Sequence, residues 1–307
     1  MGHSRYDAGL YSGYARSTAH YTPSSYTTTH LKPEFDPKKI TVRESKRSDL
    51  NPHPTPVVVA LDESGSMGTV VEAMRKGLGT LFEQVIDRKP VSDPHVMAMA
   101  VGDMEMHEVA PLQVTQFEAD PVTIGKQVEE LFLEGNGGGN GHESYLGPLY
   151  FAAMKTDCDA FSEIPPRKGF LFTVGDEEPH PVLHKGLILK YIGDEAPNDL
   201  TAEELVKMVE ANWHYYHLMV MEGSHARYHP DRVKDLWRGL IGEHAIPLTN
   251  HEKMPEVIIS LMEVVAGRDK AAIIKSWGKG TDLVVADAIA GLPAIAGSGA
   301  VTGPVAL

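Results

Sequence analysis

The sequence predicts an α/β fold that is doubly wound, with a mostly parallel central sheet and helices on both faces. The apolar, valine-rich run at residues 57–61 is typical of a strand that is buried on both faces. The stretch at 69–87 follows it with apolar residues at helical spacing. Strands and helices of these two kinds then alternate as far as residue 267. Such alternation indicates parallel strands that are joined by covering helices.

Several of these elements carry signals at their ends. Proline opens and glycine closes the helix at 121–135, and Thr201 with Glu204 forms a capping box before a further helix. Pro148 predicts a kink within its helix. The predicted strands are 57–61, 95–102, 112–117 at an edge, 169–176, 214–222 and 245–249, and the predicted helices are 69–87, 121–135, 143–154, 201–213, 230–242 and 252–267.

Composition divides the chain into three segments. Residues 1–52 form an N-terminal arm, 53–267 the α/β domain, and 268–307 a C-terminal extension with an Ala/Gly-rich tail. Half of the first thirty residues are Ser, Thr or Tyr, so they bury too little apolar surface to order themselves. The arm is therefore either a flexible tail or a segment that docks on an acidic surface. Its five early tyrosines favour docking, because tyrosine offers contact area at low entropic cost.

The charge and cysteine content exclude several classes of protein. A formal net charge of −14 argues against nucleic-acid binding and against a polybasic membrane surface. Cys158 is the only cysteine, which excludes an intrachain disulfide and fits a reducing compartment. The first ten residues lack the apolar core of a secretory signal, and prolines interrupt the uncharged last twenty. We therefore expect a cytoplasmic protein that does not enter a membrane.

The segment VVVALDESGSMG, residues 57–68, places Asp62, Ser64 and Ser66 at the end of a buried strand. A nucleophile elbow would need a glycine where Ser64 stands, and a phosphate loop would need a lysine, of which there is none between Asp62 and Met74. A carboxylate and two hydroxyls at alternate positions suit a hard cation such as Mg²⁺, Mn²⁺ or Ca²⁺. Capping of the next helix is the simpler alternative.

Two later loops offer further ligands for such an ion. Asp176 ends the strand at 169–176, and a glycine-rich loop carries polar residues just before the helix at 143–154. Because ligands of doubly wound folds bind beyond the carboxyl ends of the strands, these loops are expected to meet the first one. The polar candidates that this loop offers as ligands are Asn140, His142, Glu143 and Ser144.

Taken together, the three loops resemble those of the von Willebrand factor A (VWA) domain, over about residues 55–267. The resemblance implies a metal-ion-dependent adhesion site (MIDAS), in which Ser64 and Ser66 bind Mg²⁺ directly while the aspartates act mostly through water. Asp62 and Asp176 match the two aspartates of that family. Its threonine from the second loop is missing, since none lies between residues 135 and 144.

Three substitutes for that threonine remain open: Asn140, Ser144 or a water molecule. We take Asn140 as the predicted ligand, and place Ser144, Glu143, Glu177 and His180 at the rim of the site. The other histidine pairs with close spacing are expected in surface or packing roles, because none has two histidines on one face of a helix with apolar support. These pairs are His180/His184, His214/His217 and His225/His229.

The resemblance implies a binding protein and not an enzyme. A Mg²⁺ ion held largely by neutral oxygens keeps an open position that suits an Asp or Glu of a partner protein. Adaptors or assembly factors of this family work beside AAA+ ATPases, and self-association into a homo-oligomer is a further candidate. The alternative is a structural component of a large particle such as a virion, in which the terminal arms make the main contacts.

Overall fold

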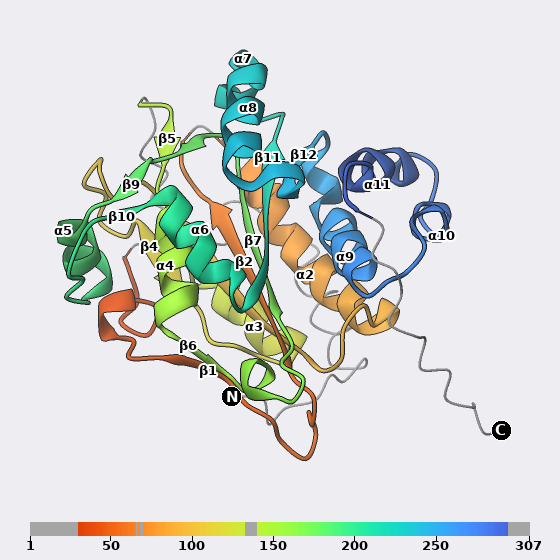
Figure 1. Ribbon diagram of the computed structural model, residues 1–307, viewed down its shortest axis with the longest axis horizontal. Coiled ribbons are helices and arrows are strands. Elements are labelled where there is room, and N and C mark those ends of the chain that lie inside the picture. Colours follow the sequence, from red (N-terminus) through yellow and green to blue (C-terminus); the bar gives the residue numbers. More distant parts are fainter. Residues whose placement is uncertain (1–29, 66, 68–69, 133–139, 294–307) are drawn as a thin grey trace.

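A six-stranded sheet forms the centre of the computed structural model, which describes residues 30–293 except 66, 68–69 and 133–139 (Figure 1). The strand order is β12-β11-β7-β2-β3-β4. Only β4 is antiparallel to its neighbour among these six strands, which confirms the prediction of a mostly parallel sheet. The strands are β2 (Thr55–Asp62), β3 (Pro94–Val101), β4 (Leu112–Val114), β7 (Gly169–Gly175), β11 (Trp213–Val220) and β12 (Ala245–Leu248).

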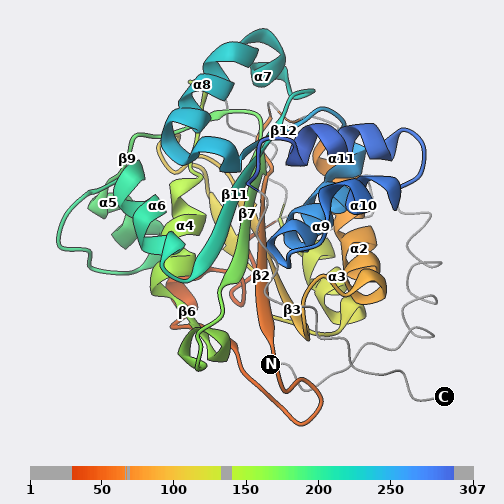
Figure 2. The ribbon, with the colours of Figure 1, turned by 45° about the vertical axis from the view of Figure 1, so that its right-hand side comes forward.

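Helices cover both faces of this sheet, as the sequence predicted (Figure 2). On β2, Val57 and Val59 face one buried apolar cluster, while Val58 and Ala60 face the other. This alternation follows from the two-residue period of a strand, and it explains the continuous apolar run. The first face is covered by α2 (Val70–Arg88), α3 (Pro121–Glu129) and α9 (Met254–Val265), and the second by α4 (Leu146–Met154), α6 (Ala202–Glu210) and α8 (Pro230–Ile241).

The start of α4 differs from the prediction. The helix begins at Leu146, so Pro148 lies in its first turn, where a missing N–H costs no hydrogen bond and no kink is required. The preceding residues form β5 (His142–Glu143), which pairs in parallel with β8 (Glu178–Pro179). This short pairing holds residues 141–143, which follow the glycine-rich segment, beside the loop that follows β7.

A connection of irregular segments joins β8 to α6 and was not predicted. Its elements are only two to five residues long, which is too short for apolar periodicity to identify a strand or helix. The predicted capping box is present, because Thr201 and Glu204 each accept a hydrogen bond from the other's backbone N–H. The unpredicted elements of this connection are β9 (Val182–Leu183), α5 (Lys185–Leu187), a π-helical turn (Ile188–Ile192) and β10 (Leu200–Thr201). A further unpredicted element, α7 (Ser224–Tyr228), lies after β11.

Residues 30–52 of the predicted arm pack against the domain. Strand β1 (Arg43–Ser45) pairs in parallel with β6 (Thr156–Cys158). The Arg43 guanidinium donates to the Val114 carbonyl at 2.8 Å, and the buried Lys155 amine donates to the carbonyls of Pro37 and Ile192. The tyrosine-rich residues 1–29, for which docking was considered, lie outside the described residues.

The C-terminal extension adds α10 (Lys270–Lys275) and α11 (Thr281–Ile289), which lie beside α9 (Figure 1). Glu263 of α9 is buried, and its carboxylate accepts from Arg88 at 2.9 and 3.0 Å and from Arg268 at 2.7 Å. Arg88 also lies over the Trp277 ring, 3.9 Å from its centroid. Within the described residues, no helix is both long and apolar enough to cross a membrane.

We expect Glu263→Gln to lower the free energy of unfolding by ~1–3 kcal/mol, because two arginines lose a charged acceptor. Chemical denaturation measures this loss. The exposed Glu252 of the same region provides the control, and Glu252→Gln should change stability by less than ~0.5 kcal/mol. Equal stability of both variants would show that the contacts of Glu263 with Arg88 and Arg268 do not stabilise the folded state.

Candidate metal centre

The candidate site lies where β2 and β7 end side by side. These strands pair in parallel, so the residues that follow them meet at one edge of the sheet. Asp62 ends β2 and Asp176 directly follows β7, and both side chains are fully buried. Ser64 is also buried, whereas the predicted ligand Ser66 lies outside the described residues.

Hydrogen bonds occupy both oxygens of Asp62. Its Oδ1 accepts from the Ser64 backbone N–H at 2.8 Å, and its Oδ2 accepts from the Tyr145 hydroxyl at 2.7 Å. Tyr145 is fully buried and packs edge-on against Trp237, with ring centroids 5.5 Å apart. The aspartate is therefore held in one orientation before any ligand arrives, which suits contact with an ion through water.

Two glycines allow these carboxylates to be buried so closely. A Cβ on Gly175 would lie 2.6 Å from Asp62 Oδ2 and would overlap the Tyr145 hydroxyl. A Cβ on Gly223 would overlap the Asp176 side chain, whose Oδ2 accepts from the His225 backbone N–H at 2.8 Å. Both positions therefore exclude side chains for steric reasons. Gly175 belongs to the strand-end segment VGDEE, but nothing local in the sequence marks this contact.

Burial and like charge act on the same groups. Burial, with the nearby Asp176 carboxylate as the next cause, raises the pKa of Asp62 to about 7. Burial and the Asp62 charge likewise raise the pKa of Glu143 well above its ordinary range. Carboxylates whose charged form is disfavoured by burial and by one another mark a candidate functional site, and a bound cation would favour their ionised form.

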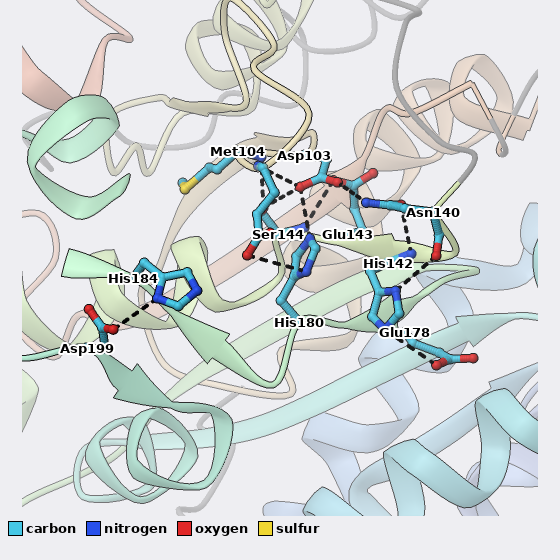
Figure 3. Close-up of polar contacts among 11 residues, drawn as sticks. Asp103, Met104, Asn140, His142, Glu143, Ser144, Glu178, His180, His184 and Asp199 are labelled. Carbon is cyan, nitrogen blue, oxygen red and sulfur yellow. Dashed lines mark hydrogen bonds and ion pairs between the residues drawn. The ribbon is translucent and has the colours of Figure 1, made fainter. Parts of the chain in front are cut away.

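Another carboxylate, that of Asp103, links the surrounding loops by hydrogen bonds (Figure 3). Its Oδ1 accepts from Ser144 Oγ at 3.2 Å and lies 2.9 Å from His180 Nε2, and its Oδ2 accepts from Asn140 Nδ2 at 2.6 Å. Burial opposes the charged form, but the hydrogen bonds led by that of His180 outweigh it and lower the pKa of Asp103. Sequence reasoning missed Asp103, although its place just after β3 was an available signal.

These contacts place the predicted loop residues. Asn140 is bound to Asp103 through its nitrogen, while its oxygen accepts from the His142 N–H at 3.1 Å. Ser144 and His180 also contact Asp103, whereas Glu143 is fully buried and interacts electrostatically with Asp62. The structure thus brings Asp62, Ser64, Asp176 and Glu143 to one edge, and gathers Asn140, Ser144 and His180 around Asp103.

The remaining acidic residues of this edge serve local contacts. Glu178 is buried, lies 2.5 Å from Arg232 Nε, and is flanked by His142 and His225. The predicted rim residue Glu177 is buried as well, and its carbonyl accepts from the Trp237 indole at 3.0 Å. Among the other predicted histidines, His217 stacks on Trp237 with ring centroids 3.6 Å apart, which is a packing role.

The donors of this edge fit a divalent cation only with additional oxygens. Within the described residues, no three His, Cys, Asp or Glu side chains form a group that would hold a metal ion alone. Oxygens of hydroxyl groups or water would have to complete the coordination, and hard cations such as Mg²⁺ and Ca²⁺ bind such oxygen ligands. One observation fits such an ion directly: the buried Oε2 of Glu143 has no hydrogen-bond partner.

Comparisons with known proteins find no match in sequence and several solved structures with TM-scores below 0.5. No family model and no curated protein matches the sequence. The pilus adhesin SpaC of Lactobacillus rhamnosus GG is 10% identical with a TM-score of 0.45, over 73% of this chain and 32% of the adhesin. Proximal thread matrix protein 1 of the mussel byssus, in a structure whose MIDAS motif holds zinc, is 11% identical with a TM-score of 0.45, over 69% of this chain and 48% of that protein.

The chain thus spans about a third to a half of these proteins. BatB of Bacteroides thetaiotaomicron is 15% identical with a TM-score of 0.32, over 54% of this chain and 66% of that chain. The topology, with β2 central and β4 antiparallel at the edge, is that of the doubly wound α/β fold that the sequence predicted. What the protein does has to be argued from its own residues.

The raised pKa of Asp62 predicts how the metal-free protein responds to pH. Between its ordinary pKa of 3.8 and its folded value of about 7, the unfolded state has released a proton that the folded state keeps. Stability in EDTA should therefore fall as pH rises through this window. We expect Asp62→Asn to flatten the decrease in melting temperature between pH 5 and pH 8, whereas the exposed-site control Asp235→Asn retains it. An unchanged slope in Asp62→Asn would contradict this assignment.

Proposed function

We propose that this protein is a metal-dependent protein-interaction module. It binds a divalent cation, Mg²⁺ or else Mn²⁺ or Ca²⁺, at the carboxyl end of the sheet, and an Asp or Glu of a partner protein completes the coordination. The observation that carries the proposal is the meeting of Asp62, Ser64 and Asp176, all buried, at the adjacent ends of β2 and β7.

The surrounding residues give the ion its setting. Tyr145 and the Ser64 backbone fix Asp62, and the His225 backbone N–H fixes one oxygen of Asp176. When bound, the cation supplies a positive charge with an exchangeable position for a hard oxygen ligand. No step of this function requires a base or a nucleophile, which is why we propose a binding protein and not an enzyme.

Charge limits the kind of partner that fits. The whole chain carries a formal net charge of −14, so long-range repulsion disfavours a strongly acidic partner. A partner surface that is basic or neutral overall avoids this repulsion. If it also presents one Asp or Glu, it supplies the carboxylate that the ion needs. Components of AAA+ ATPase systems are the partners that we propose to test first, and a second copy of the chain is the next.

We expect millimolar Mg²⁺, Mn²⁺ or Ca²⁺ to raise the melting temperature, because a ligand that binds only the folded state stabilises it. At a concentration of about 100 times the Kd, the gain is ~2.7 kcal/mol. Thermal melting of Asp62→Ala should show no such response, whereas Asp235→Ala, altered on the exposed part of α8, should respond like the wild type. A wild-type melting temperature that ignores all three ions would exclude the metal.

Partner binding should depend on the same ion. We expect a partner that is captured by the full chain in Mg²⁺ to be released by EDTA and to bind poorly to Ser64→Ala. Salt should mainly slow association, because rim charges control the rate, while loss of the metal should shorten the lifetime of the complex. Surface plasmon resonance separates these two effects. A complex that persists in EDTA and binds Ser64→Ala equally well rules out the site as the interaction surface.

A further inference from the structure

Glu143 is a fully buried carboxylate that has only one of its oxygens satisfied. It lies in β5, directly before α4, and is paired with Pro179 of β8. Its Oε1 accepts from the Ser144 backbone N–H at 3.0 Å. Its Oε2 is buried and has no hydrogen-bond partner.

The charged neighbours of Glu143 are also acidic. Asp62, Asp103 and Glu108 all act on it as negative charges. A buried carboxylate oxygen without a partner is costly, and like charges around it increase the cost. A bound cation removes both costs at once, because it supplies the missing partner and neutralises the repulsion.

The other candidates in the same loop are already engaged. Both polar atoms of the Asn140 side chain have partners, Asp103 and the His142 N–H. Ser144 Oγ donates to Asp103 and accepts from the Met104 N–H at 2.8 Å. Figure 3 shows Asn140 and Ser144 converging on Asp103. Among the described residues of this loop, Glu143 is thus the one with a buried side-chain oxygen that has no partner.

We propose that Glu143, through Oε2, is the ligand that the second loop contributes to the divalent cation, in the place of the threonine that the VWA resemblance implies. This inference rests on the proposed metal-dependent function. It replaces a neutral hydroxyl by a carboxylate. Because no three acidic or histidine side chains of the described residues form a metal-holding group by themselves, hydroxyl or water oxygens and the partner's carboxylate would complete the coordination.

Isothermal titration calorimetry on the full chain tests the assignment with Mg²⁺ and with Mn²⁺ alone, in the absence of any partner. We expect Glu143→Gln to weaken the affinity at least tenfold, because the amide keeps the size of the side chain but loses the charge. Asn140→Ala is the rival variant and should stay within about threefold of the wild type. Glu105→Gln, which changes a neighbouring acidic residue that is partly exposed, is the matched control.

Thermal melting in EDTA shows whether each variant folds. Glu143→Gln should melt at or above the wild-type temperature without metal, since a neutral amide avoids the cost of burying a carboxyl group among acidic neighbours, and it should lose most of the metal-induced increase. A merely structural role predicts the reverse, a lower melting temperature with the metal response retained. If Glu143→Gln does not fold, Glu143→Asp keeps the charge but shortens the side chain, and should fold with weakened metal affinity.

The outcomes separate this inference from the function on which it rests. Wild-type affinity in Glu143→Gln, or a larger loss in Asn140→Ala, would overturn the role of Glu143 while leaving metal-dependent binding intact. Metal binding that requires Glu143, combined with a partner complex that survives EDTA, would support the ligand and overturn the function. Absence of metal binding to the wild type would overturn both.

Discussion

The burial of like charges at one edge of the sheet is the constraint on which the rest of this structure depends. Asp62 and Asp176 leave adjacent parallel strands and are both fully buried. Their mutual repulsion in a poorly solvated setting opposes folding, and the surrounding residues relieve it by hydrogen bonds. Tyr145 donates to one carboxylate and the His225 backbone to the other. Gly175 and Gly223 give these groups the necessary space.

Two carboxylates of this edge therefore serve different purposes. Burial opposes the charge of Asp103, but hydrogen bonds from His180, the Glu105 backbone and Asn140 outweigh it, lower the pKa of Asp103 and make this residue a fixed anchor between loops. Glu143 is buried to a similar degree but has an oxygen without a partner. A buried carboxylate oxygen without a partner calls for an explanation, and a bound ion is one that also accounts for the acidic surroundings of Glu143. The contrast between an anchored and an available carboxylate is what distinguishes a structural contact from a ligand.

Most of the fold could be predicted from sequence because its signals are local. A strand buried on both faces must be continuously apolar, as β2 is, and a covering helix must show one apolar face. The first candidate metal-binding loop could also be predicted from the sequence, since Asp62 ends that strand and Ser64 follows closely. The choice among Asn140, Glu143 and Ser144 was not visible, because it depends on where neighbouring side chains point. Asp103, which engages two of them, comes from a different strand end.

Loop geometry and ion binding are coupled in this arrangement. The proposed ligands come from separate loops after β2 and β7 and before α4, and β5–β8 pairing holds two of these loops together. A cation at the point where these loops meet would reduce the repulsion between their carboxylates. Its binding would therefore also stabilise the folded conformation of the loops. Partner binding would then act on loops that the ion has already ordered. A site of this kind favours recognition by a rigid surface, because the ordering cost is met by the metal and not by the partner.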